Sequence, residues 1–312
     1  MLWRPHDPWP PLPLEPWQDT METLHLWTQI VGKVRLALTP WDNHSWHVTL
    51  YPGARGLTTG PIHHPNGTFE IEFDFRRHHL AVIPAAGDEH SFALEGLSVA
   101  TFYEALMSAL DGLGLSVDIR PTPVELPDPI TPFPEDHGHA SYDREAVERY
   151  WRVLLSIHRV FSVFRARFLG KVSPVHYFWG ASDLAVTRFS GRTAPKHPGG
   201  APNCADWVME EAYSHELSSA GFWPGAGLGE AAFYAYAYPE PDGFRAAQVA
   251  PAAASYHGEL GEFILPYEAV RTAENPDALL LEFLQSTYEA AAELGHWDRA
   301  ALEFDADRLP AR

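Results

Sequence analysis

The chain has 312 residues, enough for one large or two medium domains whose hydrophobic core needs no disulfide or metal to stabilise it. Its hydrophobic content of 46% and its charged content of 20% are typical of a globular protein. The net charge of −19, from 22 basic and 41 acidic residues, disfavours binding to nucleic acid or to an anionic membrane.

Cys204 is the single cysteine, so the chain can form no internal disulfide and no zinc site that uses several cysteines. This usage fits the reducing cytosol, and we expect a cytoplasmic protein. The N-terminal residues lack the apolar segment of a secretory signal, and no run reaches the roughly 20 apolar residues of a membrane span.

Residues 1–17 form an arm rich in Pro and Trp, in which the prolines prevent regular secondary structure. Asp19 and Glu22 then form a capping pattern at the start of a first helix. The apolar residues of this helix recur at helical spacing as far as Val34. The helix opens the first half of the chain, residues 18–120.

Short strands follow the first helix. We expect one strand over 46–51 and a clearer one over 68–75, where Phe and Ile alternate with acidic residues. A capping pattern at Thr101 predicts a second helix that ends at Gly112, and residues 117–120 can return as a strand.

Six prolines lie within residues 121–140, and this density predicts a semi-rigid linker of extended polyproline geometry. The second half, residues 141–300, begins with the longest helix, near 143–169, and a tail of residues 301–312 follows it.

Two strand segments, 175–179 and 184–189, follow the long helix and are separated at Gly180. Asn203 can cap a helix that runs to about Ser219. The half is completed by strands over 233–238 and 262–265 and by a helix that starts after Asn275.

Each half therefore contains a helix, several strands and another helix, and strands so close in sequence should pair antiparallel. We predict an α+β fold with two similar helix–antiparallel sheet–helix halves. The shared order of elements suggests an internal duplication, and the two halves can form one body.

Polar side chains that suit a ligand site are concentrated in the stretch 174–192. Arg188 alternates in register with the apolar residues before it, so it should lie on a buried face and need an anionic partner. That partner is either an internal acid, Asp183 or Glu216, or the carboxylate or phosphate of a ligand.

We expect the helix after Asn203 to fold back over these strands and to complete a cleft. Within the cleft, His is the side chain that exchanges protons at neutral pH, and Arg fixes an anionic group. The predicted catalytic residues are His176, His215, Glu216 and Asp183, and the predicted ligand-binding residues are Arg188, Arg192, Tyr236 and Trp179.

Glu211 and His215 are four residues apart and would share one face of that expected helix. With Glu216 they form either a proton-transfer or metal-binding group or an ion-paired surface patch. The sequence His215-Glu216 is not followed by the second His of a zinc protease motif, and residues 225–229 lack the dinucleotide-binding spacing. We therefore predict no metal and no cofactor.

Several long stretches carry a resemblance to a known family: 24–33, 54–59, 175–180, 213–216, 218–225 and 261–267. They are similar to the bacterial domain of unknown function 5996, over nearly the whole chain. The resemblance implies a bacterial, cytosolic protein and carries no catalytic role to any residue.

The sequence favours a small-molecule binding protein or enzyme with a polar, aromatic pocket in the second half and a small anionic ligand. The alternative is a scaffold or regulatory protein that acts through self-association, as a homodimer, or through a protein partner. A concave pocket in which the predicted residues meet would favour the first, and a flat aromatic patch the second.

Overall fold

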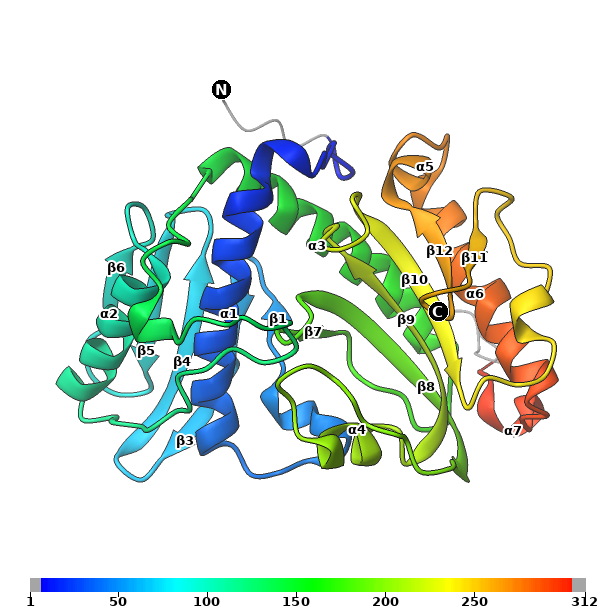
Figure 1. Cartoon of the computed structure of the whole chain (residues 1–312), viewed down its shortest axis with the longest axis horizontal. Helices are drawn as coiled ribbons and strands as arrows, with labels where there is room; N and C mark the ends of the chain where they lie inside the picture. Colours follow the sequence, from blue (N-terminus) through cyan, green and yellow to red (C-terminus); the bar gives the residue numbers. More distant parts are fainter. Residues whose placement is uncertain (1–6, 305–312) are drawn as a thin grey trace, which may run out of the picture.

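Two antiparallel six-stranded sheets make up the β-structure of the computed structural model, which describes residues 7–304 (Figure 1). The first sheet has the order β1-β2-β4-β5-β6, with β3 paired to β4. Its strands are β1 (Tyr51–Pro52), β2 (Gly56–Thr58), β3 (Ile62–His64), β4 (Gly67–Asp74), β5 (His79–Pro84) and β6 (His90–Ala93). The expected antiparallel α+β fold is confirmed.

The alternation along β4 explains how the first sheet is oriented. Phe69, Ile71 and Phe73 are fully or almost fully buried, while Glu70 and Glu72 lie on the other face and are partly exposed. The predicted strand over 68–75 therefore matches β4 to within one residue.

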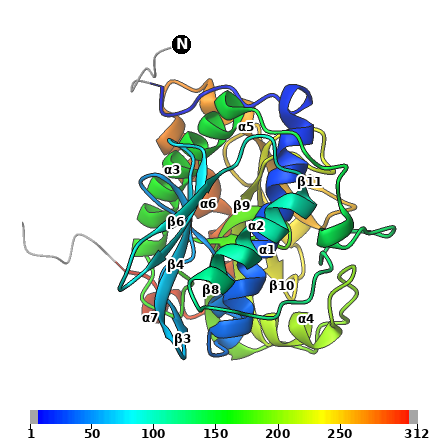
Figure 2. The same cartoon turned by 90° about the vertical axis from the view of Figure 1, so that its left-hand side faces the viewer.

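Two helices lie next to one another beside the first sheet (Figure 2). They are α1 (Gln18–Leu38) and α2 (Val99–Gly112). The residue that caps α2 is Ser98, three positions before Thr101, whose own side chain closes the capping box. The predicted helix therefore starts two residues earlier than the Thr101 pattern suggested.

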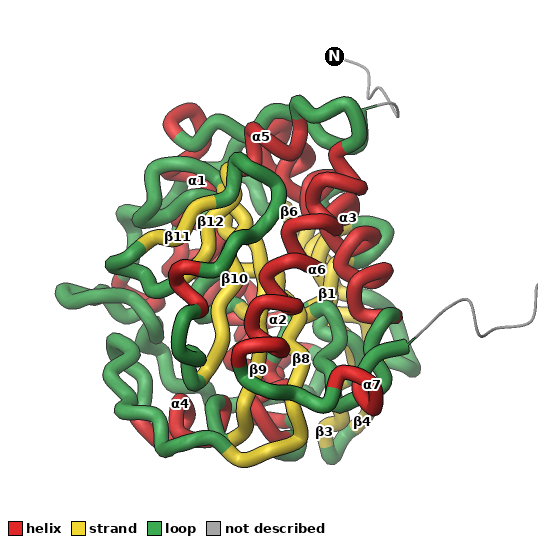
Figure 3. Tube along the Cα trace, turned by 90° about the vertical axis from the view of Figure 1, so that its right-hand side faces the viewer, coloured by secondary structure: helices red, strands yellow, loops and turns green. Residues whose placement is uncertain are grey.

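The second sheet has the order β11-β12-β10-β9-β8-β7. Helix α3 (Arg144–Ala166) and helix α6 (Pro276–Leu294) cover one of its faces (Figure 3). The strands are β7 (His176–Phe178), β8 (Asp183–Thr193), β9 (His215–Trp223), β10 (Ala232–Tyr238), β11 (Ser255–His257) and β12 (Glu262–Pro266). The shorter helices are α4 (Asp206–Ala212), α5 (Tyr267–Arg271) and α7 (Arg299–Leu302).

The helix expected from Asn203 to Ser219 is wrong. Only α4 is helical there, and His215 begins β9, a central strand between β8 and β10. The strand expected over 46–51 is also wrong for most of its length, because Asn43–Val48 form the 3₁₀ helix η2. Residues 117–120 form no strand.

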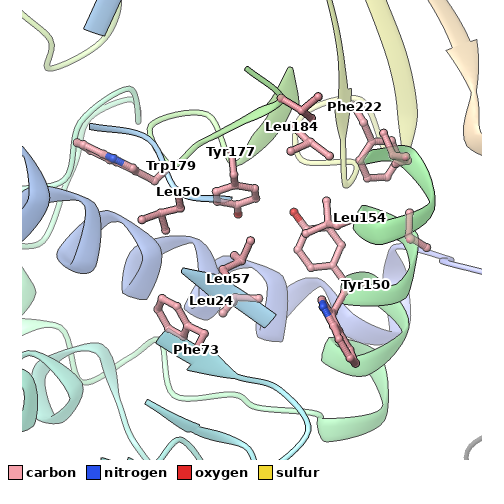
Figure 4. Close-up of a cluster of buried hydrophobic side chains, with 14 of the residues drawn as sticks. Leu24, Leu50, Leu57, Phe73, Tyr150, Leu154, Tyr177, Trp179, Leu184 and Phe222 are labelled. Carbon is pink, nitrogen blue, oxygen red and sulfur yellow. The ribbon is translucent and has the colours of Figure 1, made fainter. Parts of the chain in front are cut away.

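The two halves share one hydrophobic core. A pair of backbone hydrogen bonds between Leu50 and Tyr177, 2.9 and 2.8 Å long, joins the edge of the first sheet to β7. Leu57 and Phe73 of the first half pack in the same buried cluster as Leu154 of the second half (Figure 4). The halves therefore form one body, while their internal duplication stays a prediction.

The Pro-rich segment 121–140 is packed against both halves. Its Phe133 is completely buried, and the short 3₁₀ helix η3 (Phe133–Glu135) contacts α2. The Gln29 side chain in α1 holds Val124 through hydrogen bonds to both its N–H and its C=O, each 2.9 Å long. No helix within residues 7–304 is long and apolar enough to cross a membrane.

Candidate functional site

Strand β8 divides its side chains between the two faces of the second sheet, and this division decides which predicted residues can meet. Leu184, Val186 and Arg188 point toward α3 and α6. Asp183 and Thr187 point to the opposite face. Asp183 and Arg188 therefore lie on opposite sides of the sheet.

Arg188 is buried among aromatic rings on the helix-covered face. Its guanidinium donates a hydrogen bond to the backbone carbonyl of Phe164 and lies 3.5 Å from the ring centre of Phe164 and 4.2 Å from that of Tyr288. Burial lowers the pKa of Arg188 to about 9. The internal pairing with Asp183 or Glu216, one of the two alternatives above, does not occur.

Arg192 and Glu216 form an ion pair with each other at the surface, 2.6 Å between nitrogen and oxygen. Arg192 also donates to the carbonyls of Gly295 and His296, which follow the last turn of α6. These contacts connect the end of β8 to the end of α6. They also occupy the carboxylate of Glu216, which was expected to lie in the cleft.

His176 and His215 belong to a separate aromatic cluster, in which they are linked through His44 and Trp46. Successive ring centres from His215 to His44, Trp46 and His176 are 6.0, 5.4 and 5.9 Å apart. Burial lowers the pKa of His176 to about 3 and that of His44 to about 4, so both rings are neutral at pH 7. Lys171 Nζ donates to His44 Nε2 at 2.7 Å.

The face of the second sheet opposite α3 and α6 carries a row of hydroxyl and carboxyl groups, which we call the tyrosine face. Its members are Asp183 and Thr187 of β8, Ser219 of β9, and Tyr234 and Tyr236 of β10. The strand register places them side by side, since Tyr234 is paired with Gly221 and Tyr236 with Ser219.

Asp183 is the acid of the tyrosine face, and it is buried, with 6% of its surface exposed. Its Oδ2 accepts a hydrogen bond from the hydroxyl of Tyr234 at 2.5 Å. Burial raises the pKa of the Asp183 carboxyl to about 7, and the nearby Glu125 acts in the same direction. The group can therefore gain or lose a proton near neutral pH.

A pair of tyrosine hydroxyls lies beside the contact between Asp183 and Tyr234. The hydroxyls of Tyr236 and Tyr213 are 2.8 Å apart, and the rings of Tyr234 and Tyr236 stack with centres 6.1 Å apart. Trp223 lies against Tyr234, 4.4 Å between ring centres. Tyr236 was predicted as a ligand-binding residue, whereas its partner Tyr213, in the turn after α4, belongs to the resembling stretch 213–216 but was not predicted as a site residue.

Glu262 of β12 adds a second acid near this row. Burial raises the pKa of its carboxyl to about 8, and Asp183 acts in the same direction. No residue of the described range donates a hydrogen bond to Glu262 Oε2, although this oxygen is shielded from solvent. A buried acceptor without a donor is a place where a ligand hydrogen bond would be favourable.

The linker and the loop between β8 and α4 border the tyrosine face. The hydroxyl of Tyr238 donates to the carbonyl of Pro195, and the N–H of Glu125 donates to that of Pro202. Although Glu125 is exposed as a residue, its carboxyl packs closely against Gly180, and burial raises its pKa.

The comparisons with known proteins give one result. Residues 9–304 match the model of a family described as "Family of unknown function (DUF5996)". The chain belongs to this family. Neither the curated proteins nor the solved structures contain a match.

Helix α1 of this DUF5996 chain contacts the loop after β7, and no site residue was predicted in it although residues 24–33 carry part of the family resemblance. His25, Gln29 and Lys33 recur every four residues and so share one face. His25 and Gln29 contact the carbonyl of Gly180. Trp179, predicted to bind a ligand, donates to the carbonyl of Val48 and lies 5.9 Å from Lys33 Nζ.

Lys33 of the DUF5996 chain could have been noticed, because a lysine rarely sits inside the apolar stripe of a helix. Within residues 7–304, no group of three or more His, Cys, Asp or Glu side chains is arranged to hold a metal ion.

Proposed function

We propose that the chain binds a small molecule at the tyrosine face and that Asp183 exchanges a proton with it. The observation that carries this proposal is the buried Asp183 carboxyl, bonded to Tyr234 at 2.5 Å, with a pKa near 7. A buried acid that titrates at neutral pH is the property that general acid–base catalysis requires.

The groups around Asp183 indicate how such a ligand would be held. Tyr234 and Tyr236 supply aromatic area and hydroxyls, and the free oxygen of Glu262 supplies an acceptor. A ligand with N–H or O–H groups satisfies these acceptors. The anion-binding roles proposed for Arg188 and Arg192 do not belong to this face, because Arg188 lies behind the sheet and Arg192 pairs with Glu216.

The proposal is tested by screening small amines, amides and polyols for thermal stabilisation of the protein at pH 6 and pH 8. A compound that binds at the tyrosine face should bind the Asp183→Asn or Tyr236→Phe variant at least about tenfold more weakly, as expected for one lost charged or buried hydrogen bond.

Tyr256→Phe is the matched control. Tyr256 also donates to a carboxylate at 2.5 Å, that of Glu240, but it belongs to the edge strand β11. Compounds that bind wild type, both site variants and the control with equal affinity would refute the proposed site.

A further inference from the structure

Helix α1 carries a buried lysine without an acidic partner. Lys33 lies in the second half of α1 and is 4% exposed. Within the described part of the chain, its Nζ forms no hydrogen bond or ion pair, and its one ring contact is with Trp179 at 5.9 Å. A buried lysine is normally ion-paired or extends its charge into water, so this arrangement needs another explanation.

The surroundings of Lys33 favour its uncharged form. Burial is the main cause that lowers its pKa to about 8, and the guanidinium of Arg120 acts in the same direction. At pH 7 about a tenth of such an amine is the free base, compared with less than about a thousandth of an ordinary exposed lysine. A free amine is a nucleophile, whereas an ammonium is not.

Lys33 lies near a loop that borders the tyrosine face, because its charge and that of Glu125 both influence the pKa of the Cys204 thiol between β8 and α4. Although Lys33 Nζ has no hydrogen-bond partner among the described residues, it is not fully shielded from solvent. The small exposed part of Lys33 therefore includes its amine. One turn earlier on α1, Gln29 donates to the carbonyls of Val124 and Gly180, which border the carboxyl of Glu125. Glu125 in turn influences the pKa of Asp183 on the tyrosine face.

We propose that Lys33 is the covalent nucleophile of this site and that the substrate class is a small aldehyde or ketone that also carries hydroxyl or N–H groups. This inference names the ligand class for the proposed tyrosine-face site and so rests on that proposal. Its basis is a buried and unpaired amine, 5.9 Å from the ring centre of Trp179, on the helix whose His25 contacts Gly180.

The reaction is imine formation. The lone pair of Nζ attacks the carbonyl carbon, and the electron pair of the C=O bond moves to the oxygen, which takes up a proton. That proton comes from the attacking amine, and the resulting carbinolamine loses its hydroxyl group and the remaining amine hydrogen as water while a C=N bond forms. Water reverses the reaction, and no oxidant or reductant takes part. Proton transfer to and from the oxygen is the step that general acid–base catalysis assists.

The test is trapping with benzaldehyde and cyanoborohydride, followed by peptide mapping. Lys33, Lys171 and Lys196 are the only lysines, so each labelled amine is identified directly. Lys196, paired with Glu210 at the surface, is the internal control. At pH 7 we expect Lys33 to gain the benzyl group about tenfold faster than Lys196, since its larger free-base fraction outweighs its narrower access.

The pH dependence and a variant complete the test. Labelling of Lys33 should level off above about pH 8, where its amine is free, whereas labelling of Lys196 should continue to rise. The Lys33→Met variant, with its fold checked by circular dichroism, should lose only the Lys33 adduct. Label on Lys196 but not on Lys33 of the folded protein would overturn the inference.

The two proposals fail separately. If compounds still bind in a way that depends on Asp183 and Tyr236 while Lys33 stays unlabelled, the Lys33 inference is wrong and the binding site stands. If Lys33 is labelled at the expected rate in wild type and equally in Tyr236→Phe, and no compound distinguishes the variants, the nucleophile stands and the tyrosine face is refuted as its binding site.

Discussion

Asp183 shows how the burial of one acid affects the pH response of the fold, although the hydrogen bond from Tyr234 acts on its pKa in the opposite direction. Burial raises the pKa of Asp183 from 3.8 to about 7, so the folded protein holds this proton more tightly than the unfolded chain. The contribution of Asp183 to the free energy of unfolding therefore falls as the pH rises from about 4 to about 7, and it is at its lowest above pH 7.

We predict that Asp183→Asn weakens this dependence. Asparagine cannot ionise, so the variant should be more stable than wild type at pH 8 by on the order of 2 kcal/mol and similar to it at pH 4. Urea unfolding at the two pH values measures the difference. Some dependence should persist, because Glu262 has a pKa raised to about 8.

Asp277→Asn is the control for this prediction. Hydrogen bonds from Arg159 and Trp9 lower the pKa of Asp277, so its replacement should reduce stability at pH 8. Identical pH profiles for wild type and Asp183→Asn would contradict the prediction.

At the level of elements, the sequence predicts strands best where their side chains alternate. Strand β4 alternates large apolar and acidic residues, and its prediction was correct. Strand β9 was missed because residues 218–221, Ser-Ser-Ala-Gly, show no alternation of large apolar residues. The structure explains this smooth surface: a Cβ on Gly221 would lie 2.3 Å from the ring of Tyr234. The small residues make room for the tyrosines of β10.

The candidate site was predictable only in part for a related reason. Asp183 and Tyr236 stood out because they occur in strongly patterned strands, and they do lie on one face. Arg188 was placed correctly on a buried face, but a sequence cannot tell that aromatic rings surround it. Glu262 lies in the short strand β12, and only the fold brings its carboxyl near enough to Asp183 for this acid to influence the pKa of Glu262.

The packing of α1 against the loop after β7 leads to a second prediction. A Cβ on Gly32 would lie 2.2 Å from Trp179 Nε1, so Gly32→Ala must displace the indole and its hydrogen bond to Val48. We expect a loss of about 3 kcal/mol in the free energy of unfolding, typical of overpacking in a buried contact.

Gly112→Ala provides the matched control. Gly112 is also helical, but a Cβ at this position would meet no atom within 4 Å, so alanine should be neutral or stabilise α2 by up to about 1 kcal/mol. Chemical denaturation measures both variants. Equal effects of the two substitutions would show that α1 does not depend on contact with Trp179.

At the level of the whole molecule, the N-terminal arm fastens the second half. Trp9 is 3% exposed, and its Nε1 donates to Asp277 Oδ1 of α6 at 2.9 Å. The hydroxyls of Ser156 in α3 and Tyr267 in α5 donate to the carbonyls of Pro8 and Pro10. An arm that was expected to have no regular structure thus connects three helices.

Deletion of residues 1–11 should therefore destabilise the protein. Burial of Trp9 and its hydrogen bond contribute about 3 kcal/mol, and we expect the Tm to fall by roughly 5 °C or more. Differential scanning calorimetry measures the change. The Trp9→Phe variant, which keeps a ring and loses the donor, should lie between wild type and the deletion. An unchanged Tm after deletion would contradict the role of the arm.

The position of α1 also limits how this chain can be rearranged. By sequence α1 belongs to the first half, yet its side chains hold Gly180, which follows β7 of the second half. A chimeric protein that joins residues 1–130 of one homologue to the remaining residues of another would combine contact surfaces that did not evolve together. The halves should consequently be inherited together, and two separately expressed fragments should recover the site only when they are mixed.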